Sequence, residues 1–106
     1  MSPVIEKLLL QITYICLHIT AQGKWHAHAH LSAHVRQMDV YIQPATQIYE
    51  DGHDFVYAFN ESVYYQARNP QEPWTAEREQ HAEHALQTML ASLEPFLATD
   101  SAEVAA

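Results

Sequence analysis

Near the start of the chain, apolar residues recur at the spacing of a helix. Ser2 followed by Pro3 is typical of a helix start, because a hydroxyl caps the first turn and proline fits its first position. Apolar residues then return every three or four positions, at Ile5, Leu8, Leu9, Ile12, Ile15, Cys16 and Ile19. The spacing predicts a helix over residues 3–21 that stops near Gly23. The β-branched residues in 12–20 leave a strand as the alternative.

The next segment alternates strictly between two kinds of residue. The odd-numbered positions are apolar: Trp25, Ala27, Ala29, Leu31, Ala33 and Val35. The even-numbered positions are polar: His26, His28, His30, Ser32, His34 and Arg36. A period of two over this length predicts a half-buried strand. A second alternating run over residues 38–43 ends at Pro44, which favours another strand.

We expect these two runs to form an antiparallel hairpin with its tip at residues 36–37. Val35 then lies opposite Met38 and His34 opposite Asp39, so that apolar side chains share one face. Because the tip lacks glycine and asparagine, a four-residue loop that keeps the same pairs is favoured over a two-residue turn.

The remaining sequence predicts a third strand and a second helix. Residues 55–59 are typical of a strand, and residues 62–66 either extend the sheet or form an irregular segment. Thr75 is expected to cap the helix, whose apolar stripe comprises Ala82, Ala85, Leu86, Met89, Leu90, Leu93, Phe96 and Leu97. Pro95 predicts a kink or an end near Leu93.

These elements predict an α+β fold of order α-β-β-β-α. Two helices would cover one face of a three-stranded antiparallel sheet in a two-layer arrangement. We expect a single domain over residues 1–98 and a flexible C-terminal tail over residues 99–106, because the tail is small and polar.

Charge and cysteine content narrow the classes of partner. The chain has 106 residues, with 13 acidic and five basic side chains, for a net charge of −8. This balance disfavours nucleic-acid binding, which rests on Lys and Arg, and it fits a soluble protein that docks on a basic partner. Cys16 is the single cysteine, so we expect a reducing, cytoplasmic location. The run over residues 4–19 is short and interrupted by polar residues, which predicts no membrane anchor.

The histidines that fall on one side of the first predicted strand raise the question of a metal site. Residues two apart on a strand lie about 6.6 Å from each other and point the same way. His28 and His30, with a carboxylate, could therefore bind Zn²⁺ or Ni²⁺, whereas His26 and His30 are too far apart for all three to share an ion easily. The alternative interpretation is an exposed, pH-sensitive strand face. His81 and His84 share a helix face with glutamates, which we interpret as solvated.

The same side of the predicted hairpin is also a candidate surface for protein binding. We predict that His28, His30, His34, Asp39 and Tyr41 contact a partner protein, since histidine and tyrosine suit such surfaces. The alternative is that residues 64–74 fold over this face themselves. No pattern of a catalytic nucleophile or a phosphate-binding loop is present in the sequence.

Two resemblances bear on this interpretation. The order α-β-β-β-α resembles the double-stranded RNA-binding domain, but Glu77, Arg78 and Glu79 stand where that family has a lysine cluster. The segment from Ala33 to Ile42, Ala-His-Val-Arg-Gln-Met-Asp-Val-Tyr-Ile, is similar to a hairpin in small uncharacterised proteins of phages and prophages. We therefore expect a non-enzymatic acidic interaction module of the phage accessory, inhibitor or immunity type. One alternative is a metal-binding protein that uses His26, His28 and His30 with a carboxylate. Others are a nucleic-acid binder of the double-stranded RNA type and a homodimer paired through the open sheet face.

Overall fold

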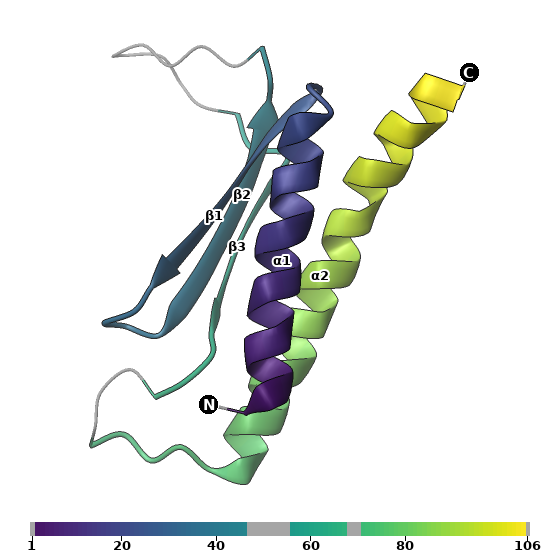
Figure 1. Ribbon diagram of the computed structural model, residues 1–106. Coiled ribbons are helices and arrows are strands. Elements are labelled where there is room, and N and C mark those ends of the chain that lie inside the picture. Colours follow the sequence, from purple (N-terminus) through teal and green to yellow (C-terminus); the bar gives the residue numbers. More distant parts are fainter. Residues whose placement is uncertain (1, 47–55, 68–70, 106) are drawn as a thin grey trace, which may run out of the picture.

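A computed structural model describes residues 2–46, 56–67 and 71–105 of the chain. It contains the elements α1 (Pro3–Ala21), β1 (Trp25–Ser32), β2 (Gln37–Pro44), β3 (Phe59–Tyr64) and α2 (Ala76–Ala105). The strands form one antiparallel sheet in the order β1-β2-β3. Both helices lie on the same side of this sheet (Figure 1). The predicted α-β-β-β-α order and two-layer α+β class are confirmed.

Helix α1 has the predicted limits, and its first turn shows why. The Ser2 hydroxyl accepts a hydrogen bond from the Ile5 N–H at 3.1 Å, which satisfies a donor that the helix leaves free. At the other end Gly23 has a positive φ of 89°, a conformation that suits glycine and ends the helix. All seven apolar residues of the predicted stripe are buried.

Helix α1 is also the one helix in the described ranges whose length and apolar composition would suffice to cross a membrane. Its mean hydropathy is 1.4. In the structure one side of α1 packs into the common core with β2 and α2, and 33% of its apolar window is buried.

The hairpin of β1 and β2 keeps the predicted parity but not the predicted pairs. Leu31 lies opposite Met38, Ala29 opposite Val40 and His30 opposite Asp39, with a turn over residues 33–36. Alternation fixes the face of a strand, but it does not distinguish registers that differ by an even number of residues. The observed register forms eight pairs, one of which joins Trp25 to Pro44, whereas the predicted register leaves Trp25 unpaired. Arg36, with φ 55°, closes the turn.

The third strand lies further along the chain than predicted. It spans Phe59–Tyr64, so the expected strand over residues 55–59 is wrong except for Phe59, and Phe55 lies outside the described residues. Residues 62–64 do extend the sheet. Val63 then lies opposite Met38, and Phe59 opposite Ile42, which keeps the apolar side of the strand toward the helices.

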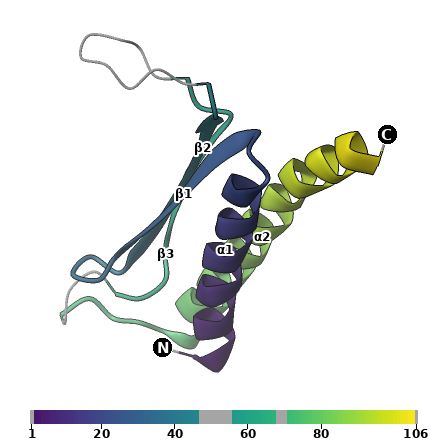
Figure 2. The ribbon, with the colours of Figure 1, turned by 45° about the horizontal axis from the view of Figure 1, so that its top comes forward.

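Helix α2 begins as predicted but does not end near Leu93. The Thr75 hydroxyl accepts a hydrogen bond from the Arg78 N–H at 3.1 Å, which caps the first turn. The helix continues through Pro95 to Ala105, so residues 99–105 are helical. Proline removes one helical hydrogen bond, and packing offsets this loss because Phe96 contacts Trp25 edge-on at a centroid distance of 5.2 Å. Figure 2 shows the yellow C-terminal end of α2 diverging from α1.

Candidate functional site

One face of the sheet is turned away from both helices (Figure 1). Paired residues of antiparallel strands point to the same side, so the side opposite the buried Met38, Val40 and Ile42 can be read from the register. We call it the outer sheet face. It carries His26, His28, His30, Ser32, Gln37, Asp39, Tyr41, Gln43, Asn60, Ser62 and Tyr64.

An aromatic cluster lies at the centre of the outer sheet face. The rings of His28 and Tyr41 are stacked, with centroids 4.5 Å apart and planes 12° apart. Tyr57, from the segment before β3, contacts Tyr41 edge-on at 5.9 Å. The Nε2 atom of His28 is buried and has no hydrogen-bond partner in the described structure. This cluster joins two neighbouring strands and a connecting segment, so its geometry is fixed from three sides.

A polar group lies beside this cluster, toward the hairpin turn. The Nδ1 atom of His30 is 3.9 Å from the Asp39 carboxylate, and the Ser62 hydroxyl donates a hydrogen bond to that carboxylate. The His30 side chain is 70% exposed and Asp39 is 28% exposed. The aromatic centre is therefore flanked by a solvent-accessible polar rim.

Four of the five residues predicted to bind a partner share this face. His28, His30, Asp39 and Tyr41 are brought together as described, whereas His34 lies in the exposed turn over residues 33–36. The expectation that His34 faces Asp39 is wrong, because the shift of register places His30 there. The sequence alone does not place Tyr57 and Ser62 on this face, because both positions depend on where β3 lies.

The structure does not gather the histidines of β1 into a three-ligand group. Within the described ranges, no three His, Cys, Asp or Glu side chains are placed to hold a metal ion together. The stacking of His28 on Tyr41 and the pairing of His30 with Asp39 direct these two side chains to different neighbours.

The described part of residues 64–74 does not support the alternative that this segment folds over the outer sheet face. Tyr65 is buried in the core and Trp74 packs against that core from the helix side, while Tyr64 is 45% exposed. Gln43 is buried, so the face is more enclosed near the end of β2 than near His30. The open part of the face is thus the half next to the hairpin turn.

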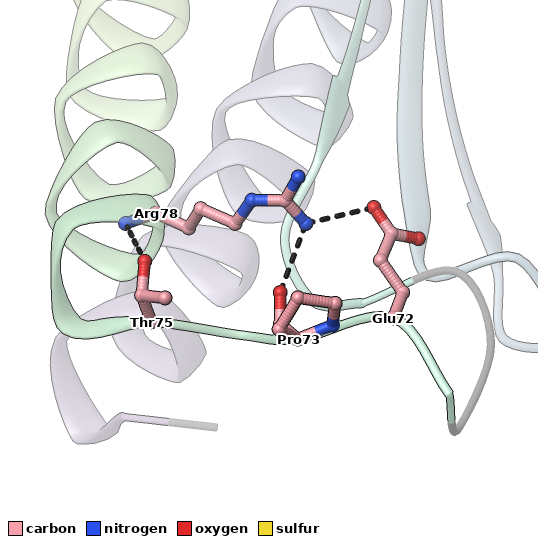
Figure 3. Close-up of polar contacts among 4 residues, drawn as sticks. All are labelled: Glu72, Pro73, Thr75 and Arg78. Atoms are coloured by element: carbon pink, nitrogen blue, oxygen red, sulfur yellow. Dashed lines mark hydrogen bonds and ion pairs between the residues drawn. The ribbon is translucent and has the colours of Figure 1, made fainter.

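A second concave region lies at the start of α2. It has a volume of about 710 Å³, and Tyr64, Trp74 and His81 are among its lining residues. Figure 3 shows that the Arg78 guanidinium beside it donates to the Glu72 carboxylate at 2.8 Å and to the Pro73 carbonyl at 2.9 Å. Because this cation is already paired and acidic side chains line the hollow, the region is poorly suited to an anionic ligand.

The single cysteine is enclosed in the core. Cys16 is 3% exposed, and burial raises the pKa of its thiol from 9.0 to about 11. The thiol is therefore protonated at neutral pH, which is the opposite of what a nucleophilic cysteine requires.

Comparison with models of protein families, with curated proteins and with solved structures finds no match to the chain. The inference of function therefore rests on the residues and geometry described above.

Proposed function

We propose that this protein is a non-enzymatic acidic interaction module of the inhibitor, immunity or phage accessory type, which binds a partner protein through the outer sheet face. The observation that carries the proposal is the aromatic cluster of His28, Tyr41 and Tyr57. A central aromatic group with a polar rim is the arrangement found at the energetic centre of protein interfaces.

Charge specifies the kind of partner. The chain carries a net charge of −8, whose long-range field attracts a basic protein and raises its association rate. Asp39 is the single carboxylate among the described residues of the outer sheet face. The field therefore steers the approach, while stacking and hydrogen bonding at the face provide the short-range contacts.

Comparative capture from a lysate of the source cells tests this proposal. Wild-type protein, the double variant His30→Ala/Tyr41→Ser and the control His81→Ala/His84→Ala are immobilised identically, and the retained proteins are compared by mass spectrometry. His81 and His84 are exposed on α2 and do not belong to the outer sheet face. We expect a basic protein to be retained by the wild type and the control but not by the face variant.

The retained protein is then purified, and its affinity is measured by titration calorimetry. The face variant should weaken binding by about tenfold or more, and raising the salt from about 0.05 M to about 0.5 M should slow association. Thermal melts establish that each variant is folded. The proposal fails if no retained protein distinguishes the face variant from the control, or if binding is independent of salt.

A further inference from the structure

Strand β1 has an unpaired edge on the side away from β2. Among the strands that the structure describes, it pairs with β2 alone. The main-chain groups of an antiparallel edge strand point alternately to its partner and to the open side. The Thr20 hydroxyl identifies the open side, because it accepts from the Ala27 N–H at 3.0 Å and donates to the Ala27 carbonyl at 3.2 Å. By alternation, the main-chain groups of Ala29 and Leu31 face the same side.

This edge lacks the features that usually prevent strands from pairing. Between Trp25 and Ser32 there is no proline, no lysine and no carboxylate. Strand β1 is a regular strand of eight residues. The side chain of Leu31, which lies on the side of the sheet that faces the helices, is 49% exposed. An open and regular edge is a template for another strand.

Helix α1 adds an apolar stripe to the same side of the molecule. Leu10, Tyr14 and Leu17 point away from the core and are 65%, 64% and 66% exposed. Their spacing of four and three residues is that of a helix–helix seam. A hollow of about 400 Å³ lies where α1 meets β1, and its lining includes Thr13, Leu17, Ala29 and His30. The stripe and the open edge therefore form one continuous surface.

The charge distribution permits a second copy of the chain at this surface, although the whole chain carries −8. Residues 1–38 contain one acid and three bases, a net charge of +2, whereas residues 39–106 contain twelve acids and two bases. The acids that would repel another copy thus belong to other parts of the sequence. The Cα radius of gyration of 15.5 Å also exceeds the roughly 13 Å expected for a compact chain of about 100 residues.

We propose that two copies of this protein form a symmetric dimer by pairing β1 with β1, which creates a six-stranded sheet with both α1 helices side by side. Setting Ala29 opposite Leu31 of the second copy uses the main-chain groups of both residues and preserves the Thr20–Ala27 hydrogen bonds. Thr13 and His30 line the same hollow, so the twofold axis passes near them. Leu10 of each copy then meets Leu17 of the other, as a self-complementary interface requires.

Sedimentation velocity of the full chain over a range of concentrations tests the dimer. The wild type should reach about 24 kDa, twice the 12.1 kDa of the chain. Leu17→Glu places two charges in the seam and should give a mass of 12.1 kDa. The control Thr88→Glu adds the same charge at an exposed position of α2 and should leave the dimer intact.

A cysteine pair near the twofold axis tests the arrangement itself. In a Cys16→Ala background, Thr13→Cys should form an intermolecular disulfide under mild oxidation, while Thr88→Cys should not. A wild type that stays monomeric at the highest concentration would overturn the proposal. A dimer that Leu17→Glu leaves intact would also overturn it. This holds even if the outer-face variant His30→Ala/Tyr41→Ser dissociates that dimer. Leu17 and Thr13 lie on α1 and do not belong to the outer sheet face, so failure of the dimer leaves the proposed function to its own test.

Discussion

The two helices cover the same face of the sheet but present opposite surfaces to water. The exposed side of α2 is polar, with Gln80, His81, His84, Gln87 and Thr88 among its residues. The exposed side of α1 carries Leu10, Tyr14 and Leu17. Packing on α1 and the sheet accounts for the pattern of α2 over residues 76–97, because its apolar stripe is buried or half-buried. The same packing accounts for only one side of α1. The apolar residues on the other side are why we propose that α1 also contacts a second copy of the chain.

The largest expected effect concerns the buried sides, where the two helices should behave alike. Ile12 on α1 and Leu86 on α2 are both fully buried. Replacing either with alanine leaves a cavity and should lower the free energy of unfolding by about 2–5 kcal/mol. Leu10→Ala, on the outer side of α1, should cost less than about 0.5 kcal/mol at low protein concentration. Urea denaturation followed by tryptophan fluorescence measures all three. A large loss for Leu10→Ala at low concentration would remove the distinction between the two sides of α1.

A smaller effect concerns the thiol on the buried side of α1. Burial raises the pKa of Cys16 from 9.0 to about 11, so the unfolded chain loses this proton at lower pH than the folded one. The stability that the protonated thiol contributes is complete below pH 9, and it is lost as the pH rises toward 11. The free energy of unfolding should therefore fall more steeply over this range in the wild type than in Cys16→Ala. Equal slopes in urea titrations at successive pH values would show that the thiol is not enclosed.

The smallest expected effect separates the first turns of the two helices. Ser2 caps α1 and also donates a hydrogen bond to Glu83 at 3.0 Å, whereas the Thr75 hydroxyl has its cap contact at 3.1 Å. Thr75→Ala should cost about 1 kcal/mol, and Ser2→Ala should cost about 1 kcal/mol more. Thermal unfolding of both variants measures the difference. If Ser2→Ala costs no more than Thr75→Ala, the contact between the helices contributes nothing.

The sequence predicted those parts of the fold that depend on local patterns. The limits of α1 followed from Ser2, Pro3 and a 3.6-residue period, and the start of α2 followed from Thr75. Period two correctly assigned the faces of β1 and β2. These features are encoded within a few residues of each other, which is why they could be read without a structure.

What the sequence did not predict depends on distant contacts. The register of β1 against β2 differs from the expected one by a shift that preserves parity, so alternation alone could not detect it. The prediction that His34 lies opposite Asp39 was wrong for that reason. Helix α2 continues beyond Pro95 because Phe96 packs on Trp25 and Phe59, residues 71 and 37 positions away. The sequence shows that Leu10, Tyr14 and Leu17 lie on one side of α1, but it does not show that this side is exposed.

The contacts of Ser2 with α2 also determine when α1 can complete its packing. Its N–H donates to Glu79 and its hydroxyl to Glu83, partners that lie 77 and 81 positions along the chain. Synthesis proceeds from the N-terminus at about 5–20 residues per second. Helix α1 therefore leaves the ribosome several seconds before α2 exists, with apolar side chains on both of its sides. Helix α1 is made before α2 but is enclosed only once α2 is present. The yield of folded protein should therefore depend on what protects α1 during that interval.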